Sequence, residues 1–328
     1  MSADLPAFDR PIRILTGPLF APGVGAKLKI RHTITVLDRQ SDSEIAQIAA
    51  ESEVVASAAF KSAWRLSGAR RPGLVHSVGA GIDGIDRASL PAGCKVCNVY
   101  GHERGVAEEA FMLILALQRG LFGLDAALRR GDWTLKPALL SELRGRRLLI
   151  LGFGHIGAEL ARFGSFFGME VTALTRYPSP ERAEKLGLRE FGALADLERH
   201  LPEADFVIVA IPHTPDTENL IGEKQLQKMK PTAFIINVGR AAVINEDALY
   251  QALRGRRIGG AGLGVWYVYP SGDEKCLPAH LPFQELDNLI MTPHKATQET
   301  VDYRIEEIAE NIRRFAVGKP LKNVVYTA

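Results

Sequence analysis

Short runs of consecutive apolar residues alternate along the chain with longer segments whose apolar residues recur at helical spacing. Runs that are apolar throughout are typical of strands buried on both faces, as in a parallel sheet. Ser41-Asp42-Ser43-Glu44, before Ile45 and Ile48, has the pattern of a capped helix start. The sequence therefore predicts an α/β protein. Strands are expected at residues 12–16, 33–37, 54–56, 74–78 and 96–99, and then at 147–151, 170–174, 206–210, 233–237 and 289–291.

The order of these segments predicts two domains, one inserted into the other. Residues 1–100 hold the first set of strands and form a doubly wound sheet of their own. A helix at 106–119, apolar on most sides, leads into a second domain and is expected between domains or at a dimer contact. A final helix at 299–316 returns the chain to the first domain, so residues 296–328 belong with it.

Composition agrees with this picture and limits the partners. With 328 residues and 46% hydrophobic content, the chain can form two cores of ordinary size. A net charge of +2 gives no reason to expect nucleic acid or a membrane surface as partner. The longest apolar run, 111–117, is too short to span a bilayer, and residues 1–10 lack a signal-peptide core.

The three cysteines favour reduced thiols in a cytoplasmic protein. Cys94 and Cys97 have C-x-x-C spacing, but no second pair of Cys or His completes a zinc site. They fall in a predicted strand, so we expect structural cysteines and no metal site.

The segment Gly152-Phe153-Gly154-His155-Ile156-Gly157 lies between the strand at 147–151 and a helix predicted at 158–167. In this order the first Gly makes the turn, the second admits phosphates, and the third lets helix pack on strand. The helix N-terminus faces the negative charge. The segment predicts a dinucleotide site.

The end of the next strand indicates which dinucleotide binds. An acidic residue is expected there for NAD, to bond the adenosine ribose. The chain has Thr175-Arg176 instead, with Arg182 following, and we expect no carboxylate to be available there to bond the ribose or to repel a 2′-phosphate. A hydroxyl and two arginines suit a 2′-phosphate. The prediction is NADP as the preferred cofactor, with NAD as the alternative if the arginines are only solvated surface charges.

Two further strand ends carry candidate chemistry. Ile235-Ile236-Asn237-Val238-Gly239-Arg240 ends in a fixed cation, and Thr292-Pro293-His294 ends in a titratable proton carrier. The cation can bind a carboxylate, the imidazole can carry a proton, and the glycine segment can bind a dinucleotide. Together these groups indicate hydride transfer at a carbon next to a carboxylate.

The chain resembles the D-isomer-specific 2-hydroxyacid dehydrogenases, in particular glyoxylate and hydroxypyruvate reductases. The resemblance rests on residues 78–86, 105–110, 143–145, 235–240 and 291–294. It implies a Rossmann NAD(P)-binding domain at 101–295 inserted into a flavodoxin-like substrate domain, with the catalytic cleft between them. It also implies a homodimer formed through the helix at 106–119.

The resemblance further implies the site residues. The catalytic set is Arg240 for the substrate carboxylate, His294 as acid/base and Tyr269 beside it. Substrate contacts are Val78, Gly79, Ala80, Gly81, Arg240 and His294, with backbone N–H groups of 79–81 completing the carboxylate site. Cofactor contacts are Gly152, Gly154, His155, Ile156, Gly157, Thr175, Arg176, Ile211, Pro212, Thr217, Val238, Gly239, Arg240, Gly264, His294 and Ala296.

Two positions depart from the family pattern. Gly264 replaces an aspartate that in the family lies near the nicotinamide, and Tyr269 replaces the glutamate that partners the catalytic histidine. A tyrosine hydroxyl can orient the ring but adds no charge, so His294 is expected to lose its proton at lower pH than in relatives with glutamate.

Three functional classes follow from these observations. The first is an NADP(H)-dependent enzyme that interconverts a 2-oxo acid and an (R)-2-hydroxy acid. The second is an NAD-dependent oxidising relative of formate or phosphite dehydrogenases, against which Thr175, Arg176 and Tyr269 count. The third is a non-catalytic NAD(P)-binding regulator, against which the intact Arg240 and His294 count.

Overall fold

The computed structural model describes residues 10–69, 71–133, 141–178, 181, 187–270, 275–295 and 297–328. The chain divides into two compact units, which are described separately below. Unit 1 is Met1–Gly101 with Ala296–Ala328, and unit 2 is His102–Lys295.

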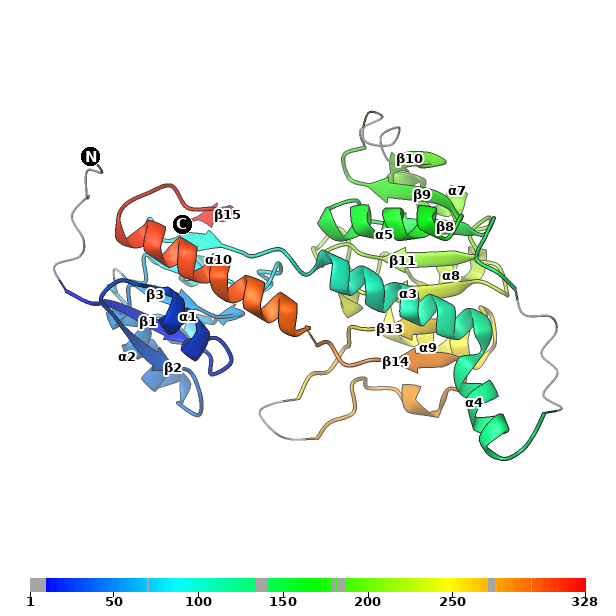
Figure 1. Cartoon of the computed structure of the whole chain (residues 1–328), viewed down its shortest axis with the longest axis horizontal. Coiled ribbons are helices and arrows are strands. Elements are labelled where there is room, and N and C mark those ends of the chain that lie inside the picture. The colour runs from blue at the N-terminus through cyan, green and yellow to red at the C-terminus, as the bar shows by residue number, and fades with distance from the viewer. Residues whose placement is uncertain are drawn as a thin grey trace. The chain divides into compact units, whose positions relative to one another are not determined.

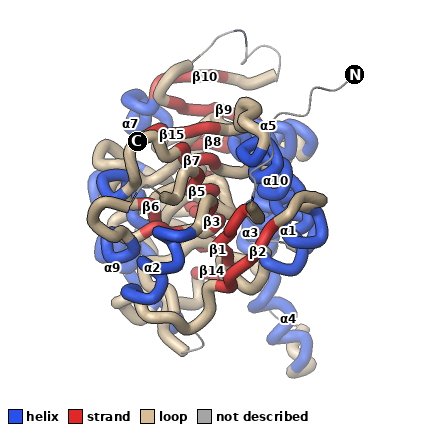
Figure 2. Tube along the Cα trace, turned by 90° about the vertical axis from the view of Figure 1, so that its left-hand side faces the viewer, coloured by secondary structure: helices blue, strands red, loops and turns tan. Residues whose placement is uncertain are grey.

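Unit 1 contains a six-stranded sheet in the order β15-β7-β5-β3-β1-β2 (Figure 2). Four of its five pairings are parallel and follow the flavodoxin-like order, and the fifth, between the edge strand β15 and β7, is antiparallel. The antiparallel edge strand β15 was not among the strands expected from the sequence. The strands are β1 Ile12–Thr16, β2 His32–Val36, β3 Val54–Ala56, β5 Leu74–His76, β7 Lys95–Cys97 and β15 Val324–Thr327, and β4 Ala59–Phe60 pairs with β6 Gly84–Ile85 in a small second sheet.

Helices cover both faces of the unit 1 sheet. Helices α1 (Ala21–Lys27) and α10 (Gln298–Ala316) pack on one core cluster, while α2 (Asp42–Glu51) and the 3-10 turn Ser62–Trp64 pack on the other. Helix α2 begins at the predicted Ser41 cap, with reciprocal bonds to Glu44. Its start is thus fixed by local chemistry.

Unit 2 contains a seven-stranded, wholly parallel sheet in the order β10-β9-β8-β11-β12-β13-β14. The strand order reverses between β8 and β11, as in a Rossmann fold. The strands are β8 Arg147–Leu151, β9 Glu170–Thr175, β10 Glu190–Ala193, β11 Phe206–Val209, β12 Phe234–Asn237, β13 Gly260–Leu263 and β14 Leu289–Met291.

The alternation of side chains along each strand of unit 2 builds two cores. In β8, Leu148 and Ile150 join the cluster under α3 and α5, whereas Leu149 and Leu151 join the cluster under α8 and α9. Figure 1 shows α3 and α5 running across one face of this sheet. The helices are α3 Glu103–Arg119, α4 Leu121–Arg129, α5 His155–Phe166, α7 Leu197–His200, α8 Glu223–Lys228 and α9 Glu246–Arg254.

Helix α3 starts three residues before its predicted position and buries Phe111, Leu113 and Ile114 against the unit 2 sheet. Its apolar character is therefore mostly explained by packing within unit 2. Met112 on α3 and Phe122 on α4 remain exposed. No single helix of the described residues could cross a membrane by length and hydropathy, although α3 and α4 pass that test together across a 58° bend.

Cys94 and Cys97 are buried free thiols at β7. Burial raises the pKa of both to about 12. Thiols that stay protonated are poor nucleophiles, so the prediction that these cysteines are structural is confirmed.

His76 ends β5 and is completely buried. Its Nδ1 lies 2.8 Å from the Ser77 carbonyl oxygen, and its Nε2 lies 2.9 Å from the amide nitrogen of Asn311 on α10. A neutral imidazole satisfies both, since Nδ1–H donates and Nε2 accepts. Burial lowers the pKa of His76 from 6.5 to about 4, while the Ser77 carbonyl and Glu307 act in the opposite direction.

Unit 1 should lose stability as the pH falls from 6.5 through about 4. Over this range the unfolded chain binds a proton at His76 that the folded unit excludes. The stability contributed by neutral His76 is therefore complete above the unfolded pKa and is lost as the pH falls through the folded pKa. At roughly 1.4 kcal/mol per pKa unit, the loss in the free energy of unfolding amounts to about 3 kcal/mol. Urea unfolding of the protein and of His76→Gln across this range measures the effect. The two proteins should differ in their pH slopes, and equal slopes would contradict the assignment.

Candidate functional site

The predicted site residues of unit 2 follow the carboxyl ends of its strands. Because the strands are parallel, all of these ends lie at one edge of the sheet. Ligands of open α/β sheets bind outside this edge, where the strand order reverses. Thr175 ends β9, and the other described residues fall after β8 (Gly152, Gly154, His155, Ile156, Gly157), β9 (Arg176), β11 (Ile211, Pro212, Thr217), β12 (Val238, Gly239, Arg240), β13 (Gly264, Tyr269) and β14 (His294).

The glycine turn after β8 has the geometry of a dinucleotide cradle. Gly152 adopts a positive φ of 102°, and a Cβ on it would lie 2.6 Å from the Ala210 carbonyl oxygen. A Cβ on Gly157 would lie 2.1 Å from the Gly152 carbonyl oxygen, whereas one on Gly154 would meet open space. The first and third glycines are thus required by packing, and the second leaves room at the start of α5. These residues fit a pyrophosphate.

The loops after β11 and β12 also touch at this edge. A Cβ on Gly239 would lie 2.7 Å from the Ile211 carbonyl oxygen, so no side chain fits there. The Thr217 hydroxyl donates to the Pro212 carbonyl at 2.8 Å and braces the loop. Ile211 and Val238 are buried, so at this edge their side chains belong to the hydrophobic cores.

Arg176, at the end of β9, has a carboxylate partner. Its guanidinium pairs with the carboxylate of Asp216, from the loop after β11, and both side chains are exposed. The expectation that no carboxylate lies near this position was therefore wrong. Arg176 and Asp216 lie on loops that are far apart in the sequence, so the residues around Arg176 could not show that the two loops meet. Arg182 and Ala296 lie outside the described residues.

Arg240 directly follows the turn after β12 and is half-buried. The Asn237 side chain holds this turn, accepting from the Gly239 N–H at 3.1 Å and donating to the Arg240 carbonyl at 3.0 Å. Arg240 Nη1 donates to the Gly239 carbonyl oxygen at 2.9 Å. The cation is thereby oriented by its own turn.

His294 and Tyr269 are in contact. The Tyr269 hydroxyl lies 3.0 Å from His294 Nδ1 and accepts a bond from the Trp266 N–H at 3.2 Å. The hydroxyl can donate to a neutral Nδ1 or accept from a protonated one. The hydrogen bond expected between these two side chains is therefore present.

Trp266 is a positioning residue that no motif in the sequence singles out. Its indole Nε1–H donates to the Thr292 carbonyl at 2.8 Å, two residues before His294, and its ring is buried. One residue thus holds both Tyr269 and the segment that carries His294. Its place in the aromatic run after β13 was the only signal in the sequence.

The predicted substrate loop lies in unit 1, after β5. Its three carbonyls are occupied: Val99 N–H donates to Gly79, the Asn98 amide to Ala80 and the Ser77 hydroxyl to Gly81. Gly79 N–H donates to Ser77 Oγ at 3.3 Å, so this amide is engaged, contrary to expectation. Within the described residues, the N–H groups of Ala80 and Gly81 have no partner and remain available to an anion.

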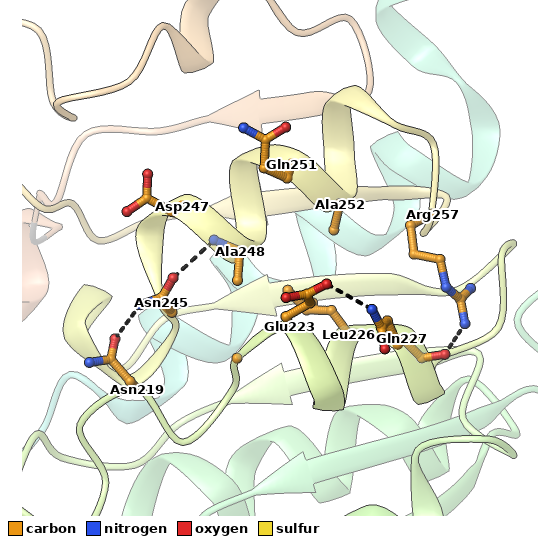
Figure 3. Close-up of a pocket in the computed structure, with 11 residues that line it drawn as sticks. Asn219, Glu223, Leu226, Gln227, Asn245, Asp247, Ala248, Gln251, Ala252 and Arg257 are labelled. Carbon is orange, nitrogen blue, oxygen red and sulfur yellow. Dashed lines mark hydrogen bonds between the residues drawn. The ribbon is translucent and has the colours of Figure 1, made fainter.

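Unit 2 also has a pocket on its surface. A groove of about 580 Å³ lies between α8 and α9, with Glu223, Asn245 and Arg257 among its lining residues (Figure 3). None of the predicted site residues lines it.

A family model described as D-isomer specific 2-hydroxyacid dehydrogenase, NAD binding domain, matches residues 111–296, which is more than half of the chain. The chain belongs to this family. The fold class and the family resemblance predicted from the sequence are thereby confirmed.

Curated relatives agree with this. The glycerate dehydrogenase of Methylorubrum extorquens is 34% identical over 263 residues, covering 77% of this chain and 78% of that protein. The glyoxylate reductase of Thermococcus litoralis is 34% identical over 263 residues, covering 77% and 76%. The chain spans about half the length of the D-3-phosphoglycerate dehydrogenases that it matches, 44% of the one from Synechocystis sp. and 51% of the one from Archaeoglobus fulgidus.

Solved structures show the same fold. An acyclic imino acid reductase in complex with NADPH and D-Arg superposes with a TM-score of 0.81 at 25% identity, covering 96% of this chain and 100% of that chain.

Replacing Tyr269 by Glu should move the alkaline limb of the pH–rate profile for 2-oxo acid reduction to higher pH. A carboxylate on Nδ1 stabilises the imidazolium, so the proton needed for reduction is kept longer as the pH rises. Tyr269→Phe, which removes the hydrogen bond without adding charge, is the matched control and should lower turnover without such a shift. A folded, active Tyr269→Glu protein with an unmoved limb would show that position 269 does not act on His294.

Proposed function

We propose that the protein is an NADP(H)-dependent oxidoreductase that interconverts a 2-oxo acid and an (R)-2-hydroxy acid. The observation that carries this proposal is that one sheet edge holds the glycine turn after β8, Arg240 after β12 and His294 after β14. Family membership supports the reaction class, and the names of the relatives in Methylorubrum and Thermococcus support small 2-oxo acids such as hydroxypyruvate or glyoxylate.

In this proposal the cofactor, when bound at the glycine turn, supplies or accepts the hydride at C2 of the substrate. Arg240 binds the carboxylate through its planar fork and polarises the neighbouring carbonyl. His294 donates a proton from Nε2 to the carbonyl oxygen during reduction and takes it back during oxidation. Tyr269 holds Nδ1 in either protonation state, because its hydroxyl can donate or accept.

For unit 1, we propose the amides of Ala80 and Gly81 as further carboxylate donors. Their carbonyls are turned to Asn98 and Ser77, so the loop offers N–H groups rather than acceptors. Two successive backbone N–H groups can bind an anion when both point to it.

Arg240→Ala should impair both KM and kcat for glyoxylate and hydroxypyruvate, because it removes the carboxylate contact and the carbonyl polarisation together. Arg240→Lys should recover only part of the loss, since it keeps charge but not the bidentate geometry. His294→Ala should lower kcat by about a hundredfold or more while KM changes little. NADPH oxidation measures all three.

Binding of NADPH without reduction of any 2-oxo acid in a panel that includes bulky aromatic ones would overturn the enzymatic proposal. That outcome would favour the non-catalytic regulator.

The preference for NADP over NAD is a separate part of the proposal. It is supported by Thr175 in place of an acidic residue and by Arg176 beside it, but Asp216 competes for that guanidinium. Both partners of this pair are exposed, so the pair is weak and a 2′-phosphate can exchange with the carboxylate.

NADPH should bind more tightly than NADH in fluorescence titration. Asp216→Asn should tighten NADPH binding by about two- to fivefold and leave NADH unchanged, because only a 2′-phosphate uses the released arginine. Thr175→Asp should weaken NADPH by charge repulsion and raise relative use of NADH. Tighter binding of NADH by the unmodified protein would show that the preference is wrong.

A further inference from the structure

Glu109 places a carboxylate at the same sheet edge, although it belongs to α3 rather than to a strand end. Helix α3 runs over β12 and β13 (Figure 1). Leu113 packs on Gly262, where a Cβ would lie 2.9 Å from the Leu113 Cβ. One helical turn earlier, Glu109 reaches the carboxyl end of β13. Its Oε1 accepts a bond from the Thr292 hydroxyl at 2.6 Å.

The carboxylate of Glu109 occupies the room that a side chain at position 264 would need. A Cβ on Gly264 would lie 2.9 Å from Glu109 Oε1 and 3.3 Å from its Cδ. Gly264 does not have a positive φ, so its backbone does not require glycine. A side chain at position 264 would therefore require the flexible end of Glu109 to move.

Glu109 is half-buried and, among the described residues, forms no ion pair with a lysine or arginine. Its only hydrogen bond within the described residues is the one from Thr292, which leaves Oε2 free of donors there. A carboxylate that is partly removed from water favours a ligand that brings N–H donors. At an edge built for a nicotinamide dinucleotide, the group with two such donors is the primary carboxamide of the nicotinamide.

We propose that Glu109 binds the carboxamide of the nicotinamide and so replaces, from a neighbouring helix, the aspartate that the family resemblance led us to expect at position 264. This inference rests on the proposed function. Thr292, two residues before His294, fixes Oε1 and thereby links the orientation of Glu109 to the segment that carries the acid/base.

The test measures cofactor binding rather than turnover. Glu109→Gln keeps the volume and an acceptor for Thr292 but removes the charge, and it should weaken binding of the reduced dinucleotide by about tenfold. The acetylpyridine analogue, which has a methyl group in place of the carboxamide nitrogen, should bind the protein and the variant equally. Glu108→Gln, at the preceding, exposed position of α3, is the matched control and should bind as the unmodified protein does.

A rescue experiment separates a specific contact from a folding effect. Gly264→Asp alone should bind the dinucleotide poorly, because the new carboxylate meets Glu109. Combined with Glu109→Ala, the same Gly264→Asp change should recover most of the binding, since the charge then comes from position 264. Thermal unfolding verifies that each variant is folded.

The outcomes distinguish the two levels of the proposal. A protein that binds no dinucleotide would overturn the proposed function. Dinucleotide binding that Glu109→Gln leaves unchanged, or weakens equally for the acetylpyridine analogue, would overturn the role of Glu109 alone. The role of Glu109 would also be overturned if the folded double variant, Glu109→Ala with Gly264→Asp, bound the dinucleotide no better than Gly264→Asp alone.

Discussion

In a parallel sheet every strand ends at the same edge, and in unit 2 this alignment governs where chemistry can occur. The seven strands place the glycine turn, Arg240 and His294 at one edge although they are far apart in the chain. The loops there are in backbone contact, since neither Gly152 nor Gly239 has room for a Cβ beside Ala210 and Ile211. Because the main chains of these loops are in contact, their polar groups and the N-terminus of α5 can bind a ligand at this edge.

The two departures from the family pattern are connected through the segment that follows β13. Trp266 binds Tyr269 through its N–H and Thr292 through its indole, while Thr292 in turn binds Glu109. Tyr269 rather than a carboxylate contacts His294, and a carboxylate reaches the edge from α3. Catalytic geometry at this edge therefore depends on hydrogen bonds between elements rather than on one motif.

Several elements followed from local rules. Strand β8 and the turn after it were predictable because an apolar run and a glycine spacing are complete within a few residues, and α2 because its cap is local. Strand β13 reads Gly-Ala-Gly-Leu, which has little strand propensity, and it is a strand because β12 and β14 enclose it. Strand β15 reads Val-Val-Tyr-Thr and has strand propensity, but it is short and mostly exposed, and its antiparallel place at the sheet edge depends on pairing with β7.

The sequence by itself determined the fold class, the family and the residue types at the strand ends, since periodicity and motif spacing are properties of neighbouring residues. Only the tertiary structure decided which groups meet. Asp216 reaches Arg176 across 40 positions and Glu109 reaches Thr292 across 183, and each pair is brought together by strand order or by the seating of a helix on the sheet. Contacts between elements depend on topology and packing, which no local pattern of residues encodes.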